Sequence, residues 1–422
     1  MTNKAKKVVA IVSAIIGASI SFTLGFFVRN LTLDSDLRDA YILLQQYKQH
    51  YLFDDGDVVT DIENALLDKY SSFFSKEEYD AIKKKAKGES VGIGIAVQTG
   101  TTIISQVVEN SPSEKAGVKP GGNVVAVLDG GEYKQISAYS EFTKVINSTS
   151  IGSNVCFKVD YGNGNIKEYS VVKKKYQTSY VIYQDDTNCY GYSDDNGSME
   201  RTLKQNYCTI VGNNVAYIKY TAFNGTKSGL NGSVGQLADA LSIFKQNGKT
   251  KLILDLRDNG GGYMDTLCQV ASHLISVENG KTALVSVAVD KNGKKENYYS
   301  SKSVYNSYGF EKIVVMCDEG TASASEALIG AMLDYDTNNI VNVVVSSSTL
   351  NGQTVYKSYG KGIMQSTFVN IDGSAVKLTT AQIYWPVSNT TIHNTGIITE
   401  VSNKVVNAQK ETALETALSL MN

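Results

Sequence analysis

Residues 313–326 have the sequence IVVMCDEGTASASE, and this stretch organises the second half of the chain. It begins as a short apolar run, passes through a turn at 318–320, and continues into a segment whose apolar residues recur at helical spacing. Such a run, followed by a turn and a 3.6-residue period, predicts a strand, a tight turn and a helix. We therefore expect an α/β unit with Ser323 at the start of its helix.

Ser323 is a candidate nucleophile. The first turn of a helix carries unpaired backbone N–H groups and the positive end of the helix dipole, and both stabilise developing negative charge. Serine and threonine are also the residues that ordinarily cap helices, and Thr321, Ser323 and Ser325 all fit that role. From this stretch alone, a catalytic serine and a plain N-cap both stay open.

A second unit of the same kind precedes the first. LILDLR at 252–257 predicts a buried strand, DNGGG at 258–262 a turn, and the apolar positions within 267–275 a helix. Glycines between a strand and a helix let backbone N–H groups point at an anion. The loop could hold a phosphate, although it lacks the Lys-Ser pair of a P-loop. It could also be half of an oxyanion hole beside Ser323, or a plain tight turn.

Residues 1–31 predict a membrane anchor with a short cytoplasmic tail. Lys4, Lys6 and Lys7 precede an uncharged run over 8–28. At ~1.5 Å per residue this run reaches roughly 30 Å, the thickness of the hydrocarbon core of a bilayer. No clear A-x-A cleavage site follows, and the preceding lysines favour an N-terminus inside the cell. The expectation is a single-pass protein of the cell membrane with most of its chain on the extracytoplasmic side.

The composition argues against nucleic-acid binding and against a metal site. The net charge is −2, from 40 basic and 42 acidic residues, so no basic surface for nucleic acid is indicated. The chain has only 3 histidines, and its 5 cysteines show no C-x-x-C spacing. We therefore expect neither a metal nor a cofactor.

Periodicity and composition divide the rest of the chain. Residues 32–88 predict a small helical unit, and 89–176 a β domain with glycine-rich turns. The polar segment 177–212, rich in tyrosine and asparagine, indicates a connector with an irregular insertion. Strands and helices alternate over 213–405, and 406–422 predicts a C-terminal helix. The expected fold class is mixed α/β.

Residues 89–176 resemble a PDZ domain of the kind found in bacterial proteases. The resemblance is carried by GIGI at 92–95 and SPSEKAGVKPG at 111–121. It implies that backbone N–H groups of the first motif hold a terminal carboxylate while the bound peptide adds as a strand. The peptide-binding residues it implies are Gly92, Ile93, Gly94 and Ile95.

Four motifs in the second half resemble, in order, the carboxy-terminal processing protease family, also called tail-specific proteases. They are LDLRDNGGG at 254–262, GTASASE at 320–326, YGKGIMQ at 359–365 and DGSAVKLTTA at 372–381. Together with the helical unit and the PDZ-like segment, the resemblance covers most of residues 36–400. It implies that Ser323 is the nucleophile, Lys361 the general base and Gln365 the residue that orients the lysine. The oxyanion hole that it implies is formed by backbone N–H groups of Ala324, Gly261 and Gly262.

The chemistry of the residues agrees with a serine–lysine pair. No motif places a histidine beside Ser323, so a lysine is the more economical base. A free lysine has a pKa near ~10.4, so a basic lysine has to lie in an apolar pocket. One departure bears on Lys361: it follows Ser323 by 38 residues, more than a dozen beyond what the resemblance leads us to expect. The extra chain falls around 336–356.

The expected function is a membrane-anchored, extracytoplasmic serine endopeptidase that cleaves proteins near the C-terminus. Its PDZ-like domain would bind the tail of the substrate, and self-association is left open. A catalytically inactive scaffold that binds protein C-termini is the alternative, if the extra chain displaces Lys361. A third interpretation is an anchored PDZ regulator whose second half mediates assembly.

Overall fold

The computed structural model describes residues 40, 43–44, 58–87, 89–98, 101–185, 188–194, 198–204, 214–225, 229–350 and 352–421. The predicted anchor over 1–31 lies outside these residues, and no helix within them is long and apolar enough to cross a bilayer. The chain divides into two compact units, Met1–Phe73 and Phe74–Asn422, and each is described by itself. The first contains α3 (Val58–Leu66).

Helix α4 (Lys76–Ala86) opens the second unit, just after the short strand β1 (Ser72–Phe74). Its start has a capping box, because the Ser75 N–H donates to the Glu78 carboxylate at 2.8 Å and the Glu78 N–H donates to the Ser75 hydroxyl at 3.3 Å. Its end is held by the Gly225 N–H, which donates to the Ala86 carbonyl at 2.9 Å. Residue 225 follows a strand of the central sheet, so this bond attaches α4 to the second half of the chain.

The PDZ-like segment is a small β domain with two short helices. The strand expected over 90–97 is divided at its glycines: the part before Ile93 pairs with β9, and the part after Gly94 pairs with β4. Gly94 has φ 83°, and a Cβ there would lie 2.1 Å from Ser111 Cβ, so the break requires glycine. The elements are β2 (Glu89–Gly92), β3 (Ile95–Val97), β4 (Ile104–Val107), α5 (Pro112–Lys115), β5 (Asn123–Asp129), β6 (Glu132–Gln135), α6 (Tyr139–Ser148), β7 (Asn154–Asp160), β8 (Ile166–Val172) and β9 (Lys174–Gln177).

An eight-stranded sheet forms the centre of the second half, in the order β12-β11-β10-β13-β14-β17-β18-β23. Its parallel strands are β13 (Val215–Tyr220), β14 (Lys251–Asp255), β17 (Lys312–Cys317), β18 (Val341–Ser346) and β23 (Val405–Ala408). Three antiparallel strands extend one edge: β10 (Val181–Asp185), β11 (Asn188–Ser193) and β12 (Glu200–Leu203).

The three antiparallel strands correct the expectation of an irregular insertion over 177–212, as far as that segment is described. The Tyr183 ring stacks on Tyr190 with centroids 5.4 Å apart and meets the Phe244 ring edge-on at 5.6 Å. Aromatic residues favour strands when a neighbouring layer covers them, and such a layer cannot be read from local composition. The C-terminal expectation also changes, because β23 occupies 405–408 and only α10 (Ala413–Ser419) is helical.

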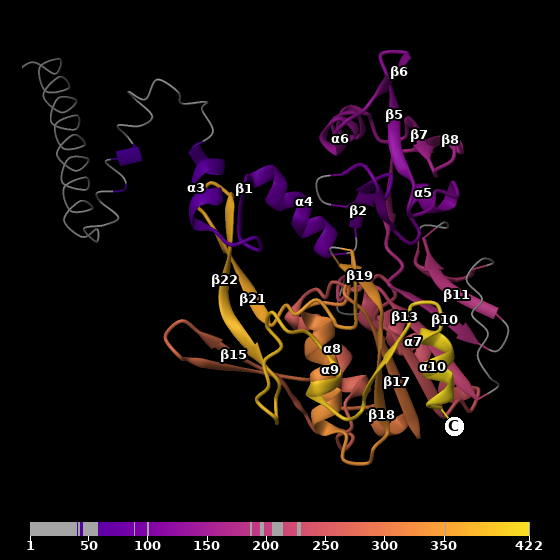
Figure 1. Ribbon diagram of the computed structural model, residues 1–422, viewed down its shortest axis with the longest axis vertical. Coiled ribbons are helices and arrows are strands. Elements are labelled where there is room, and N and C mark those ends of the chain that lie inside the picture. The colour runs from indigo at the N-terminus through magenta and orange to yellow at the C-terminus, as the bar shows by residue number, and fades with distance from the viewer. Residues whose placement is uncertain are drawn as a thin grey trace, which may run out of the picture. The chain divides into compact units, whose positions relative to one another are not determined.

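Helices cover both faces of the sheet (Figure 1). On one face lie α7 (Ser233–Gln246), α8 (Met264–Leu274) and α9 (Ala324–Tyr335), and on the other lies α10. Side chains alternate along each strand, so Val315 of β17 packs under the first group whereas Val314 and Met316 pack under α10. The loops at the carboxyl ends of β14 and β17 therefore emerge beside each other, since these strands are neighbours.

A second sheet contains β15 (Leu284–Asp290), β16 (Lys295–Tyr299), β21 (Ile363–Val369) and β22 (Ala375–Tyr384). The long hairpin β21–β22 carries the chain that follows Lys361. The extra chain around 336–356 forms β18 of the central sheet and a separate small hairpin, β19 (Ser348–Leu350) with β20 (Gln353–Val355). The insertion is therefore largely accommodated as regular structure.

A buried ionic cluster lies at the end of β14. The Asp255 carboxylate accepts a hydrogen bond from Arg257 Nη2 at 2.6 Å and from the Tyr217 hydroxyl at 2.8 Å, and Lys219 Nζ lies 3.7 Å away. Burial raises the pKa of Asp255, but the charges of Lys219 and Arg257 outweigh that effect and lower the pKa to about 2. The carboxylate therefore stays ionised in the folded protein well below its usual range.

We expect Asp255→Asn to destabilise the fold at neutral pH by about 3–5 kcal/mol, because the buried cations lose their counter-charge. The folded pKa lies below the unfolded one. The contribution of this ionisation to the free energy of unfolding is therefore fully present above roughly pH 4. It is lost as the pH falls toward the pKa of Asp255 in the folded protein, about 2. Urea unfolding at a series of pH values should show the difference between wild type and variant shrinking over that window. The exposed Asp129, paired with Lys134, supplies the control Asp129→Asn, and an equal effect of both substitutions contradicts the prediction.

Candidate active site

Ser323 occupies the N-cap position of α9 with φ 58° and ψ −114°. Helix N-caps ordinarily have extended backbone angles, so this conformation is unusual for a cap. Non-glycine residues with strained backbone cost about 1–3 kcal/mol and cluster at functional sites. A sharp strand-to-helix turn of this type exposes the nucleophile in α/β-hydrolases. The backbone of Ser323 therefore favours the catalytic interpretation over the plain cap.

The turn that carries Ser323 is joined to the loop after β14. The Asn259 carbonyl accepts hydrogen bonds from the Ala322 N–H at 2.9 Å and the Ser325 hydroxyl at 3.0 Å. The buried Asp318 carboxylate accepts the Asp258 N–H at 2.9 Å. The two turns that the sequence predicts separately thus form one structure, which holds Ser323 in its strained conformation.

The glycines of this loop have different roles. A Cβ on Gly261 would lie 2.7 Å from the Ala322 carbonyl oxygen and 2.8 Å from the Ala324 nitrogen, so only glycine permits this approach. The Gly261 N–H donates to the Asn259 side chain at 2.9 Å, so it is not available to an oxyanion. Gly262 and Ala324 both line the cavity beside Ser323. An oxyanion hole formed by the N–H groups of these two residues stays a prediction.

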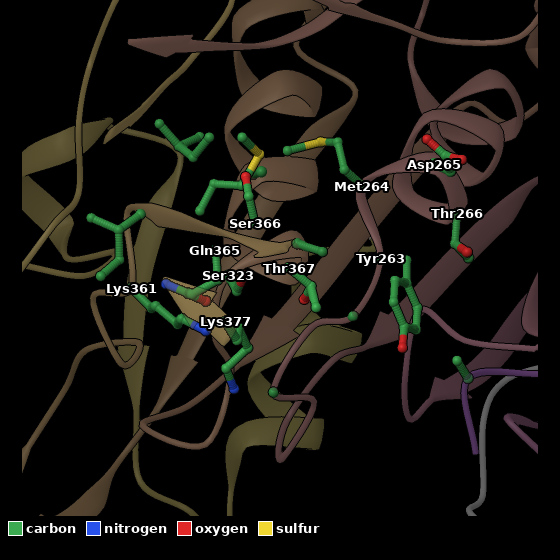
Figure 2. Close-up of a pocket in the computed structure, with 18 of the residues that line it drawn as sticks. Tyr263, Met264, Asp265, Thr266, Ser323, Lys361, Gln365, Ser366, Thr367 and Lys377 are labelled. Carbon is green, nitrogen blue, oxygen red and sulfur yellow. The ribbon is translucent and has the colours of Figure 1, made fainter. Parts of the chain in front are cut away.

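Lys361 and Gln365 line the same cavity as Ser323, a space of about 1360 Å³. Figure 2 shows the three side chains in one part of this cavity. Lys361 is only partly exposed, and Gln365 donates from Nε2 to the Thr379 hydroxyl at 3.2 Å across the β21–β22 hairpin. Although the chain between Ser323 and Lys361 is long, it still returns the lysine to the serine's cavity.

The two glycines beside Lys361 allow a close backbone approach. A Cβ on Gly360 would lie 3.0 Å from the Gly396 nitrogen, and one on Gly362 would lie 2.7 Å from the His393 nitrogen. Lys361 is thus held against the segment 392–396 through backbone packing. His393 takes part in this packing with its main chain.

Glu326 joins the serine and the lysine, a connection that sequence reasoning missed. Its fully buried carboxylate accepts the Ser323 N–H at 2.8 Å, the Lys361 N–H at 2.9 Å and the Gly360 N–H at 2.8 Å. It also accepts the Ser358 hydroxyl at 2.5 Å. Burial raises the pKa of Glu326, and these four donors oppose the rise. The Ser-x-x-Glu spacing is a signal for a capping box only, and nothing local announces the bonds to 358–361.

Part of the cavity is apolar. Its apolar lining includes Met264, Ala327, Ile363, Ile383, Trp385 and Ile392. The Trp385 ring packs against α9 at Gly330, where a Cβ would lie 2.1 Å from the indole. Gly330 therefore sets the position of this wall of the cavity, which suits an apolar side chain of a ligand.

The predicted peptide-binding residues extend from Gly92, the last residue of β2, to Ile95, the first residue of β3. The Gly94 carbonyl accepts the Val108 N–H on the side of β4, at 2.9 Å, so the next carbonyl, that of Ile95, faces the opposite edge. Within the described sheets β3 pairs with β4 alone. The Tyr139 hydroxyl, from the first residue of α6, donates to the Ile95 carbonyl at 3.0 Å. The edge that an added strand would use is thus partly occupied by a side chain.

A strained serine at a helix start, with a lysine and a glutamine in one cavity of an α/β fold, is the arrangement of a serine peptidase. Residues 214–402 of this chain match peptidase family S41.

Two curated relatives and one solved structure extend the comparison. The chain is 26% identical over 404 residues to a probable CtpA-like serine protease of Staphylococcus saprophyticus, covering 92% of this chain and 71% of the relative. It is 26% identical over 339 residues to a protein of the same description from Staphylococcus aureus, covering 80% of this chain and 57% of the relative. The fold is similar to that of a photosystem II D1 C-terminal processing protease, with TM-score 0.53, 20% identity, and coverage of 91% of this chain and 89% of that chain.

Proposed function

We propose that this chain is a serine endopeptidase in which Ser323 and Lys361 act as nucleophile and general base. The observation that carries the proposal is that a strained Ser323 and a partly buried Lys361 face one cavity and are tied through their backbones to the same carboxylate, Glu326. Backbone hydrogen bonds that fix two reacting groups in position remove the entropic cost of orienting them during the reaction.

The proposed reaction follows from this geometry. The neutral Lys361 amine takes the proton of the Ser323 hydroxyl as its oxygen attacks the substrate carbonyl carbon. The resulting oxyanion accepts from the N–H groups of Gly262 and Ala324. The protonated lysine then gives its proton to the departing amine, which leaves an ester on Ser323. Water, deprotonated by the same lysine, hydrolyses the ester and regenerates the serine.

The proposed substrates are polypeptides cut near the C-terminus, with an apolar side chain in the part of the cavity beside Trp385. The names of the relatives and the resemblance of 89–176 to a PDZ domain support capture of a C-terminal tail on β3. The lysine-flanked apolar run over 8–28 supports a membrane-anchored protein with its peptidase part outside the cytoplasm.

A fluorophosphonate probe tests the proposed function directly. Such a probe phosphonylates an activated serine hydroxyl, so the full-length protein should be labelled at Ser323, and mass spectrometry of peptides locates the label. Labelling should also block cleavage of an unstructured test protein with an apolar C-terminus. A folded protein that neither reacts with the probe nor cleaves the test protein excludes the peptidase and leaves the scaffold that binds tails.

The contact between Tyr139 and Ile95 predicts the effect of Tyr139→Phe. A peptide that adds to β3 needs the Ile95 carbonyl as an acceptor, so the tyrosine hydroxyl has to leave first. Removing that competing hydrogen bond should tighten binding of an apolar C-terminal peptide roughly 3- to 10-fold, the effect of about 1 kcal/mol. Fluorescence anisotropy with the full-length Ser323→Ala protein measures this. Tyr133→Phe, in β6 of the same domain, is the control, and weaker or unchanged binding by Tyr139→Phe contradicts the prediction.

A further inference from the structure

We propose that the cavity contains a second subsite, centred on Lys377 with Lys83 and Lys87 on the facing side, that binds a carboxylate of the substrate about two residues from the bond that is cut. The inference rests on the proposed function, because it takes a polypeptide at Ser323 as the ligand. The three lysines come from two separate elements that both line the cavity.

The position of Lys377 follows from the register of the β21–β22 hairpin. Gln365 is paired with Thr379, and Thr367 with Lys377. The side chains of Gln365 and Thr379 are hydrogen bonded, so they lie on one face, and residues two positions further along lie on the same face. Gln365, Thr367 and Lys377 all line the cavity, in agreement with this alternation. Lys377 therefore lies about 7 Å along the hairpin from the Gln365–Thr379 pair, which is the length of two residues of an extended chain.

Helix α4 and the residue that follows it supply the other two lysines. Its cavity-lining residues are Tyr79, Ile82, Lys83, Ala86 and the following Lys87, at helical spacings of three and four, so one face of the segment points at the cavity. The bond from the Gly225 N–H to the Ala86 carbonyl holds the end of this helix in place. Near its start, Gly373 at the tip of the hairpin approaches the stem of Lys76, with 3.1 Å from a Cβ position to Cγ. The helix and the hairpin thus form facing sides of one space.

The positions of the charges favour an anion beside Lys377. The Lys377 ammonium lies 5.5 Å from the centre of the Phe74 ring, which also lines the cavity. Lys83 is paired with Asp80 at 2.6 Å, but both side chains are about half exposed, so this pair is weak and can be exchanged. Asp265 is the acidic residue among those that line the cavity, and Figure 2 shows it beside Thr266, on the far side from Lys377.

A carboxylate that reaches this subsite has two sources in a polypeptide. One is the side chain of an aspartate or glutamate near the scissile bond, and the other is the terminal carboxylate of a substrate cut two residues from its end. Both present the same group to the lysines, and amidation of the C-terminus separates them.

The test uses peptides with one apolar sequence in which a single glutamate or glutamine is scanned over three positions on each side of the scissile bond, each with a free or an amidated C-terminus. We expect glutamate to raise kcat/KM over glutamine at one position by roughly five- to tenfold at low salt. If the terminal carboxylate is the ligand, amidation lowers kcat/KM by the same factor instead. Lys377→Gln should bring the ratio close to one, whereas Lys84→Gln, on α4 but outside the cavity lining, should preserve it.

The same peptides are measured for binding to full-length Ser323→Ala protein. Binding and cleavage together show whether the peptidase or the subsite is wrong. Cleavage by the wild type with no preference at any position and no effect of amidation overturns the subsite and leaves the peptidase. The subsite is likewise overturned if the preference persists in the variant in which Lys377, Lys83 and Lys87 are all glutamine. In a third outcome, the wild type cleaves none of the peptides while the glutamate peptide binds more tightly than its glutamine counterpart. If Lys377→Gln removes that difference in binding, the peptidase is overturned and the subsite is retained.

Discussion

Ser323→Ala and Lys361→Ala should each abolish cleavage of a tailed substrate while the protein stays folded. Ser323 supplies the oxygen that attacks and Lys361 the base that takes its proton, so removing either one stops bond formation. Loss of a nucleophile or its base in a serine peptidase costs about 10⁴- to 10⁶-fold in kcat. The kcat of the double variant should be no lower than that of either single variant, because the two residues act as one unit.

The measurement is the rate of product formation from an unstructured test protein, followed by mass spectrometry, with circular dichroism and thermal unfolding as checks on folding. Ser242→Ala on α7 and Lys410→Ala near the C-terminus are matched controls, since both residues are exposed and do not line the cavity. Equal activity in Lys361→Ala and wild type would remove the lysine from the mechanism. Equal activity in Ser323→Ala would remove the serine as well.

Glu326→Ala should produce the largest effect among residues that touch no substrate. Four donors, the N–H groups of Ser323, Gly360 and Lys361 and the hydroxyl of Ser358, would lose their buried acceptor together. Each unsatisfied buried donor costs about 1–3 kcal/mol, so even with partial relaxation a loss of about 3–5 kcal/mol of unfolding free energy is expected. Catalysis should fall by at least about 100-fold, because small displacements of reacting groups have effects of that size.

Glu326→Gln separates positioning from stability. The glutamine has the same shape, but its NH2 group replaces one carboxylate oxygen and accepts no hydrogen bond. Either the Ser323 and Lys361 N–H groups or the Ser358 hydroxyl and Gly360 N–H group therefore lose their acceptor. We expect kcat to drop more than tenfold while KM changes little, at a temperature well below the unfolding midpoint. Full activity of Glu326→Gln with a lowered midpoint would show that Glu326 only stabilises the fold.

Local sequence patterns predict much of the architecture. The apolar runs at 252–257 and 313–317 and the helical spacing after each one correspond to β14, β17, α8 and α9. Ser323 is expected at a helix start because its neighbours have that periodicity, and the structure places it there. Such features are set by residues close in the chain, where side-chain period and turn chemistry act directly.

Other features could not be predicted because they depend on contacts between distant residues. The strands within 181–203 are stabilised by aromatic packing on α7, which their polar composition does not reveal. The Gly261 N–H is engaged by the Asn259 side chain, so one predicted oxyanion donor has another partner. Even the Ser-x-x-Glu motif, visible as a capping box, does not show that the same carboxylate binds Gly360 and Lys361.

The sequence by itself determined the alternation of strands and helices, the glycine-rich turns, the resemblance to processing proteases and the residue types needed for serine–lysine chemistry, because each of these resides in short stretches of chain. Only the tertiary structure decided that Ser323 adopts a strained backbone, that Lys361 returns to its cavity across a long insertion, and that Glu326 connects the two. The physical reason is that a buried carboxylate must find its donors wherever the fold brings them, and here the fold brings them from segments more than thirty residues apart.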